Sequence, residues 1–316
     1  MNWFSLPLHG VACQPWCEHT QVEHAIQLVE GKPIVLSGEP IWQGQQHNDN
    51  STTQVALYKN NSAYTLNINC QGKGRFTLQG NTFAIDWQPG GTPASHYFQS
   101  MGLALWLELN GVMCLHGNAL SKGERTIIVL APSGTGKSTL SGALMQQGFT
   151  LLTDDMVALY EENRAGQTEY GVYPSWPIMR LWPNSIEHVL NANESTTHKN
   201  EAFKKVHDKF EKRIVPINTK QQEQQHNKKK VTDIFLLKRV DNVSDPGHFT
   251  VTPLPGGEAV MALMQNTILG EVYRPLNLEQ QRMLSLAKMA EGMKVNVITY
   301  PSGTQGLQAV TNWLAN

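Results

Sequence analysis

The order of apolar and polar residues divides the chain into a strand-rich N-terminal stretch and a longer region where strands and helices alternate. From about Leu57 to Gln88, short runs of alternating apolar residues are separated by Asn-Asn, Gly-Lys-Gly and Gly-Asn turn signals. Period-two alternation bounded by such turns is typical of β-hairpins. This pattern predicts a β-meander in the N-terminal part of the chain.

The pattern changes after residue 96. Residues 97–110 carry apolar side chains too densely for a solvent-facing strand, and they predict a mostly buried helix before the turn at Gly111. Residues 112–120 and 126–131 then predict two buried strands joined by a short turn. After a glycine-rich loop, residues 138–148 have helical spacing and end in a glycine, and residues 149–160 predict a further strand.

The remaining chain continues this alternation. Strands are predicted over residues 232–240, 249–254 and 295–300, with helices starting near Gly257 and Glu279 and a final helix over 306–314. Strands and helices alternating around a glycine-rich loop predict an α/β core. We expect a β-rich module in residues 1–96 and an α/β domain in residues 97–316.

Composition narrows the classes of partner. The 316 residues are 40% hydrophobic, enough for a buried core, and the formal net charge is −1. This charge gives no general electrostatic reason to expect a nucleic acid or an anionic membrane as partner. The chain shows no apolar run near the ~20 residues of a membrane span and no basic segment followed by an apolar core at the start. We expect a cytoplasmic protein whose four scattered cysteines are reduced.

One segment is strongly basic. Residues 199–230 hold nine lysines and Arg213 against four acidic residues, and their Gln- and Lys-rich end, 219–230, predicts a solvated loop. The preceding residues 173–185 are rich in proline and aromatic residues. Pro177 and Pro183 exclude a long helix there.

Residues 131–138, Ala-Pro-Ser-Gly-Thr-Gly-Lys-Ser, match the phosphate-binding loop G-x-x-x-x-G-K-S/T except that Ala131 replaces the first glycine. In such a loop the glycines let the backbone wrap around phosphate oxygens, the lysine bridges the β- and γ-phosphates, and the hydroxyl faces Mg²⁺. The predicted strand before the loop and helix after it supply the required context. We expect ATP and Mg²⁺ as ligands, with the nucleotide bound by Ser133, Gly134, Thr135, Gly136, Lys137, Ser138 and Thr139.

Two carboxylates follow the next predicted strand. Asp154 and Asp155 should lie at its carboxyl end beside the loop, where ligands collect in α/β sheets. Adjacent residues of a strand point to opposite sides, so one carboxylate could hold Mg²⁺ while the other accepts a proton from an attacking hydroxyl. His116 ends a neighbouring predicted strand and could orient the acceptor, the aspartate or the γ-phosphate.

Residues 115–159 resemble the catalytic core of the HPr serine kinase/phosphorylase family and its related proteins, which share a fold with ATP-dependent phosphoenolpyruvate carboxykinases. The resemblance depends on a His-Gly near a strand end, the Ser-Gly-x-Gly-Lys-Ser loop, a helix ending in glycine, and a double aspartate about seventeen residues after the loop lysine. Weaker similarity covers about residues 98–316. The resemblance implies a P-loop kinase core of the HPr kinase type in residues 97–316, preceded by a different N-terminal module.

The family's roles transfer to matching positions in this sequence. Asp154 becomes the base that deprotonates the acceptor, His116 assists it, Lys137 binds phosphates, and Ser138 and Asp155 lie near the metal. The authentic HPr enzyme has two sequence signatures that are associated with its reverse, phosphorylase reaction. Neither signature occurs in this sequence. We therefore expect neither that reaction nor HPr as the acceptor.

Positive charge for the transferred phosphoryl group could come from Arg180 or from the basic cluster, and the cluster could equally be a solvated face. Arg213 is the preferred catalytic candidate, because a guanidinium binds two phosphate oxygens at once and its segment resembles the family's basic one. The other cluster members are Lys204, Lys205, Lys209 and Lys212.

The sequence thus predicts an ATP-dependent kinase that phosphorylates a hydroxyl, preferably a serine of a protein or precursor peptide. Two alternatives stay open: a kinase of a small hydroxylated metabolite, and a regulatory module that binds ATP without transfer. A homo-oligomer is compatible with each of them. The sequence also leaves open whether GTP or pyrophosphate replaces ATP.

Overall fold

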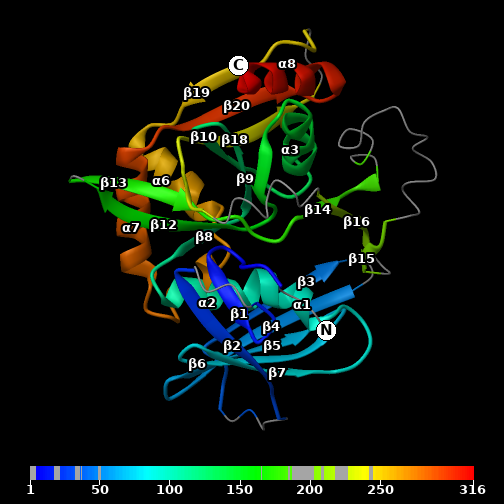
Figure 1. Cartoon of the computed structure of the whole chain (residues 1–316), viewed down its shortest axis with the longest axis vertical. Coiled ribbons are helices and arrows are strands. Elements are labelled where there is room, and N and C mark those ends of the chain that lie inside the picture. The colour runs from blue at the N-terminus through cyan, green and yellow to red at the C-terminus, as the bar shows by residue number, and fades with distance from the viewer. Residues whose placement is uncertain are drawn as a thin grey trace.

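The computed structural model describes residues 5–17, 22–32, 36, 38–48, 51–164, 166–183, 186, 203–207, 210–217, 227–241 and 245–316. Over these residues the chain is a mixed α/β protein, as predicted, with sheets of seven, six, four and three strands (Figure 1). Within the same residues, no helix is both long and apolar enough to cross a membrane.

The N-terminal part forms the seven-stranded sheet, in the order β1-β2-β7-β6-β5-β4-β3. Strands β3 to β7 are an antiparallel meander, which confirms the prediction for residues 57–88, whereas β2 runs parallel to both β1 and β7. The sequence pattern did not predict β1, β2 or β3. The strands are β1 Val11–Gln14, β2 His24–Glu30, β3 Trp42–Asn48, β4 Ser51–Asn60, β5 Ala63–Asn69, β6 Lys73–Gln79 and β7 Thr82–Trp87.

A continuous helical segment covers one face of this sheet (Figure 1) and confirms the helix predicted over residues 97–110. It consists of α1 Ala94–Tyr97, the π-helical turn η1 Phe98–Gly102 and α2 Leu103–Leu109. The buried ring of Phe98 packs edge-on against Phe76 and Phe83 of the sheet. Because a Cβ at Gly102 would lie 2.9 Å from the Phe98 ring, the glycine lets this ring fold back under its own helix.

The six-stranded sheet has the order β11-β9-β10-β18-β20-β19. Its central strands β10, β18 and β20 are parallel, and β9, β11 and β19 are antiparallel to their neighbours. The strands are β9 Gly117–Lys122, β10 Arg125–Leu130, β11 Thr150–Thr153, β18 Asp233–Val240, β19 Thr250–Pro253 and β20 Val295–Pro301.

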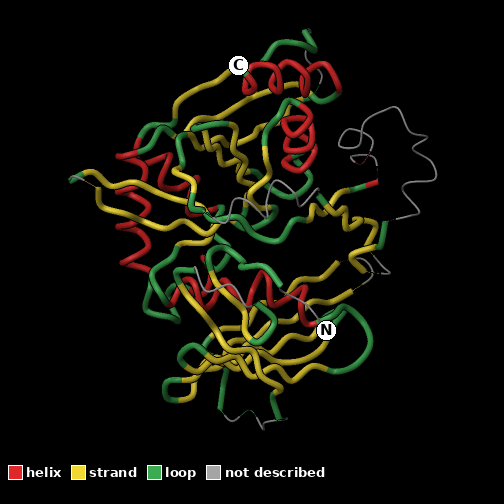
Figure 2. Tube along the Cα trace, in the orientation of Figure 1, coloured by secondary structure: helices red, strands yellow, loops and turns green. Residues whose placement is uncertain are grey.

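Helices cover both faces of this sheet, which Figure 2 shows in red on either side of the yellow strands. Ile127 and Val129 of β10 share a core with α3 and α8, whereas Ile128 and Leu130 share another with α6 and α7. A strand that is buried on both faces has apolar residues at consecutive positions, as the sequence of β10 shows. The helices α3 Lys137–Gln146, α6 Gly256–Gln265, α7 Glu279–Gly292 and α8 Thr304–Ala315 confirm the four predicted ones.

The four-stranded sheet β17-β13-β12-β8 lies between these two parts (Figure 1). Along β12, Val157 and Leu159 join the core of α6 and α7, whereas Ala158 and Tyr160 join the core over the N-terminal sheet. That second core therefore runs across residue 97, and the domain division there stays a prediction. The strands are β8 Met113–Leu115, β12 Val157–Arg164, β13 Gln167–Val172 and β17 Lys229–Lys230.

Two predicted strands are each divided between two sheets. Residues 112–120 split at His116 into β8 and β9, and residues 149–160 split at Asp154 and Asp155 into β11 and β12. The continuous strands predicted there are wrong, because the backbone changes direction at each crossing. The expectation that His116 and the two aspartates follow strand ends is confirmed, since β8 ends at Leu115 and β11 at Thr153.

The proline-rich and basic segments supply the three-stranded sheet β14-β16-β15. Within the predicted loop 219–230, residues 219–226 lie outside the described part, whereas Lys229 and Lys230 form β17 and are not loop. Lys209 also lies outside the described residues. The strands are β14 Ile178–Leu181, β15 Lys205–His207 and β16 Phe210–Pro216.

Candidate active site

The glycine-rich loop joins the end of β10 to the start of α3. Gly134 and Gly136 have φ angles of 84° and 110°, which side chains with a Cβ rarely adopt. The Tyr300 hydroxyl donates to the Thr135 carbonyl at 3.1 Å, and a Cβ at Gly136 would lie 3.0 Å from that hydroxyl oxygen. The loop is therefore held against β20 as it enters the helix, whose first N–H groups have no intrahelical acceptor.

Lys137 is folded back onto its own loop. Its side chain is buried, and Nζ donates to the Ala131 carbonyl at 2.5 Å. Nζ also lies 3.2 Å from His116 Nε2. Burial lowers the pKa of Lys137. The structure thus brings together the loop lysine and the histidine that the sequence analysis selected.

The hydrogen bonds of His116 fix its tautomer. Nδ1 lies 3.0 Å from the carbonyl oxygen of Asp155, and because a carbonyl can only accept, Nδ1 carries the proton. Nε2 is then the acceptor for Lys137. Burial, followed by the Lys137 charge, lowers the pKa of His116, so the imidazole is neutral at pH 7. Its backbone N–H donates to the Asn266 carbonyl at 2.6 Å.

Asp154 and Asp155 form a turn rather than part of a strand. Asp155 has a φ angle of 68°, and its N–H donates to the Asn118 side chain at 3.2 Å. Asn118 in turn donates to Ser141 Oγ at 2.9 Å, which connects the turn to β9 and α3. The expectation that strand alternation separates the two carboxylates is wrong, because Asp155 has a left-handed backbone conformation and neither aspartate lies in a strand.

The two carboxylates have different partners. Asp154 accepts from Ser138 Oγ at 3.4 Å and from the backbone N–H of Arg180 at 2.8 Å, whereas Asp155 accepts from the Arg180 guanidinium at 3.1 Å. Burial and the charge of Asp155 raise the pKa of Asp154 to about 7. Burial alone would raise the pKa of Asp155, but the charges of Arg180 and Lys212 lower it. Near pH 7 one carboxylate is ionised and the other is poised to exchange a proton.

The register of β14 and β16 distinguishes the basic residues. Arg180 lies opposite Ile214, and Leu181 lies opposite Arg213. Alternation therefore places Lys212 on the face of Arg180, and Arg213 on the face of the buried Leu181. Lys212 lowers the pKa of Asp155, so its charge acts on the site. The catalytic role of Arg213 stays a prediction, and the strand pairing that favours Lys212 leaves no local signal in the sequence.

Gln99 is a residue of this site that the sequence analysis did not select. Its Oε1 accepts from the Arg180 guanidinium at 3.1 Å, which connects η1 to the aspartate turn. Gln99 Nε2 and Arg180 Nε are both buried and have no hydrogen-bond partner among the described residues. Buried donors are normally satisfied, so the hydrogen bonds of this pair are incomplete.

The donor set fits a nucleotide phosphate and Mg²⁺. Protein sites for Mg²⁺ usually supply one or two carboxylates and leave other positions to water and phosphate. Ser138, Asp154 and Asp155 are such a set. Within the described residues, no three His, Cys, Asp or Glu side chains form a metal-binding group of their own. Of the other loop residues expected to bind phosphate, Ser133 is exposed and Thr139 is half-buried.

No protein-family model matches the sequence, and no curated protein matches it. Among solved structures, the Hpr(Ser) kinase/phosphatase from Coxiella burnetii is similar over 64% of this chain and 87% of its own, with 15% identity and a TM-score of 0.33. A likeness of this size assigns neither the fold nor an activity to this chain. The mixed α/β architecture and the site geometry stand independently of it.

Proposed function

We propose that this chain binds ATP and Mg²⁺ at residues 131–139 and transfers the γ-phosphoryl group to a hydroxyl. The supporting observation is the pair of adjacent carboxylates with opposite pKa shifts, placed beside Ser138 of a glycine-rich loop. Carboxylates whose surroundings separate their pKa values commonly divide acid–base roles between them. The loop belongs to a P-loop kinase core under this proposal.

The loop residues bind the nucleotide. The backbone of residues 133–136 and the start of α3 receive the phosphate oxygens, and Lys137 exchanges the Ala131 carbonyl for the β- and γ-phosphates. Ser138 and a carboxylate hold Mg²⁺, which neutralises charge on the phosphates when bound. His116 accepts from Lys137 through Nε2, so it aligns the ammonium toward the phosphates without carrying charge itself.

The aspartate turn assists the attacking hydroxyl. Asp154, with a pKa of about 7, accepts the hydroxyl proton as the oxygen attacks the γ-phosphorus. The bond from this phosphorus to the β-phosphate oxygen breaks in the same step, and ADP leaves. Asp155 stays ionised and holds Arg180 in place. Arg180 and Lys212 supply positive charge on the same side of the site, where the transferred group develops negative charge.

Asp154→Asn tests the assignment of the base. General-base catalysis contributes about 10²–10⁴-fold, so we expect a loss of this size in transfer from labelled ATP, with little change in ATP affinity. Asp155→Asn is the matched control, because it removes the neighbouring charge and keeps Asp154. Transfer by Asp154→Asn at the wild-type rate would exclude Asp154 as the base.

The contact between Ser138 and Asp154 favours a second arrangement, in which Asp154 rather than Asp155 is the magnesium ligand. A magnesium titration of ATP binding separates the two. If Asp154 is the base, Asp154→Asn leaves the half-saturating Mg²⁺ concentration unchanged and Asp155→Asn raises it. If Asp154 is the ligand, Asp154→Asn raises it instead.

For the acceptor, we infer a serine of a protein or peptide, with a small hydroxylated metabolite as the alternative. Incubation with labelled ATP and cell extract distinguishes them, because label in small molecules and none in protein contradicts the protein acceptor. ATP binding with transfer to neither would favour the regulatory module. Under the proposal, neither nucleic acid nor a membrane is a partner. Size measurement with and without ATP would test for a homo-oligomer.

A further inference from the structure

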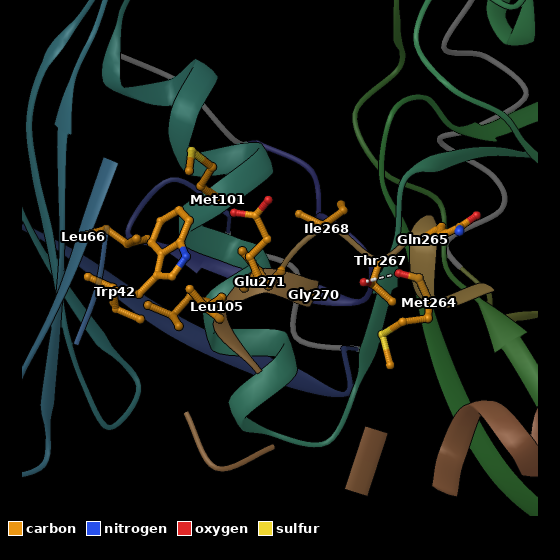
Figure 3. Close-up of a pocket in the computed structure, with 13 residues that line it drawn as sticks. Trp42, Leu66, Met101, Leu105, Met264, Gln265, Thr267, Ile268, Gly270 and Glu271 are labelled. Atoms are coloured by element: carbon orange, nitrogen blue, oxygen red, sulfur yellow. Dashed lines mark hydrogen bonds between the residues drawn. The ribbon is translucent and has the colours of Figure 1, made fainter. Parts of the chain in front are cut away.

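A cavity of about 540 Å³ lies between the N-terminal sheet, the helical segment 98–109 and the residues that follow α6 (Figure 3). The sheet contributes Trp42, Leu57 and Leu66, and the helical segment contributes Met101 and Leu105. Figure 3 shows Trp42 and Leu66 facing the segment 264–272 across the space. The volume is within the usual range for binding sites of small molecules.

The far wall of the cavity is attached to the candidate active site. Gln265 and Thr267 line the cavity, and the residue between them, Asn266, accepts the backbone hydrogen bond of His116 at 2.6 Å. Thr267 also forms a β-bridge with Leu115, and the Ile268 N–H donates to the Cys114 carbonyl at 2.9 Å. The strand that ends at His116 therefore fixes the position of this wall.

The helical wall is attached to the site as well. Gln99 lies two residues before Met101 and accepts from Arg180, whose guanidinium also binds Asp155. The helical segment that carries Met101 and Leu105 is therefore connected to the aspartate turn through Gln99 and Arg180.

The lining chemistry defines the class of ligand. Most lining side chains are apolar, with Met264, Ile268 and Val272 adding to those above. The charged residue among them is Glu271, which is exposed at the short 3₁₀ helix η3 Gly270–Val272. Its carboxylate disfavours an anionic group. A neutral aromatic or branched aliphatic group would be transferred from water into this lining favourably.

We propose that this cavity receives a bulky, uncharged apolar group of the phosphoryl acceptor. This inference rests on the proposed kinase function and names its substrate class: a hydroxyl compound with a large apolar substituent. The substituent is either a side chain near the acceptor serine of a peptide or the body of a small molecule. Both sources share this chemistry, and the experiment below distinguishes them.

The first arm measures binding of the neutral fluorophore N-phenyl-1-naphthylamine to the full-length protein without nucleotide. We expect saturable binding, weakened at least tenfold by Met101→Trp, which fills the cavity from the helical wall. Met283→Trp is the matched control, because Met283 lies on α7, outside the cavity, and is 38% exposed. Equal affinity of the two variants, or no saturable binding by the wild type, would overturn the proposal.

Folding is checked separately for each variant by thermal unfolding and by ATP binding with Mg²⁺. Ile268→Phe fills the cavity from the opposite wall and replaces Met101→Trp if that variant fails to fold. Because the fluorophore arm uses no nucleotide, its result is independent of the kinase function. A failure of ATP binding in the wild type would contradict the proposed function and leave the fluorophore result as it stands.

The second arm measures transfer from labelled ATP to a mixture of serine peptides with randomised flanking residues and, in parallel, to neutral hydroxylated aromatic compounds. We expect label in acceptors with a bulky apolar group, reduced at least tenfold by Met101→Trp and unchanged by Met283→Trp. Label in peptides or in small molecules identifies the source. Labelling without preference for apolar acceptors would overturn this inference, whereas the proposed kinase function would still hold. No labelling in either set would contradict both.

Discussion

Two of the carboxylate–guanidinium pairs in the described part of the protein differ in how completely their hydrogen bonds are satisfied. Glu108 of α2 and Arg282 of α7 are both almost fully buried, and Arg282 donates to the Glu108 side chain and backbone and to the Gly111 carbonyl. Glu108 also accepts from Tyr273 Oη at 2.9 Å and from the Cys114 N–H at 2.7 Å. This pair is a closed network that connects two helices.

The pair of Arg180 and Asp155 is an open network. The Arg180 side chain is 13% exposed and that of Asp155 is 24% exposed. Arg180 Nε and the amide of its partner Gln99 lack acceptors among the described residues. A closed buried network holds elements together, whereas an open one keeps capacity for a ligand. The comparison therefore assigns stability to the first pair and chemistry to the second.

Arg282→Met would test the structural side of the comparison most strongly. Removing one partner leaves a buried carboxylate without its counter-charge, so we expect the free energy of unfolding to fall by about 3–5 kcal/mol in urea. The double variant Glu108→Leu with Arg282→Met should recover only part of this loss, because the Cys114 N–H and the Tyr273 hydroxyl then lack their acceptor. A change below about 1 kcal/mol in the single variant would mean that the closed network does not hold the helices together.

Asp154→Asn should stabilise the protein while it inactivates the site. The folded-state pKa of Asp154 is raised to about 7, so this residue contributes stability below pH 4 that is lost as pH rises through about 7. At pH 8 we expect the variant to exceed the wild type by at most about 4 kcal/mol, the equivalent of the shift. The lowered pKa of Asp155 acts oppositely, so Asp155→Asn should bring no such gain. Urea unfolding at pH 5 and 8 measures both, and equal stability of Asp154→Asn and wild type at pH 8 would contradict the raised pKa.

Arg180→Met should divide activity from stability. We expect transfer from labelled ATP to fall about 10²-fold, because a positive charge facing the phosphoryl group is lost. The free energy of unfolding should change less than in Arg282→Met, since solvent and Lys212 still reach Asp155. Phosphoryl transfer and the free energy of unfolding are measured for both Arg180→Met and Arg282→Met. A larger stability loss in Arg180→Met than in Arg282→Met would reverse the assignment.

Lys212→Gln compared with Arg213→Gln gives the smallest expected effect. Lys212 lies on the face of Arg180 and lowers the pKa of Asp155, so its loss should reduce transfer about tenfold through one long-range charge. Arg213→Gln should reduce transfer less, because its strand face is that of Leu181. Rates at low and high salt measure this, since screening weakens the Lys212 effect. A larger loss of transfer in Arg213→Gln than in Lys212→Gln would make Arg213 the preferred catalytic cation again.

The repeating parts of the fold were predictable because each carries a local period. The meander of β4 to β7 and the four helices α3, α6, α7 and α8 match their predicted positions. The divided strands were not, because apolar residues stand on both sides of His116 and on both sides of Asp154 and Asp155. A segment that is buried in one sheet and a segment that is divided between two sheets have the same apolar residues. Tertiary packing therefore decides where the backbone turns.

The candidate site divides in the same way. The loop residues and the aspartates follow a motif with fixed spacing. The structure brings Lys137 into contact with His116, and Ser138 into contact with Asp154. Gln99 and Lys212 join them through elements that are distant in sequence. Their contributions depend on the π-helical turn and on the register of β14 with β16, and neither is encoded by a local motif.

The two crossings of the chain from the six-stranded to the four-stranded sheet have a mechanical consequence. His116 and Asp155 each occupy one crossing, and their hydrogen bond joins the crossings at 3.0 Å. This hydrogen bond therefore constrains any rotation of one sheet against the other at the residues that carry the candidate chemistry. The backbone hydrogen bond from His116 to Asn266 extends the constraint to the cavity wall at 264–272.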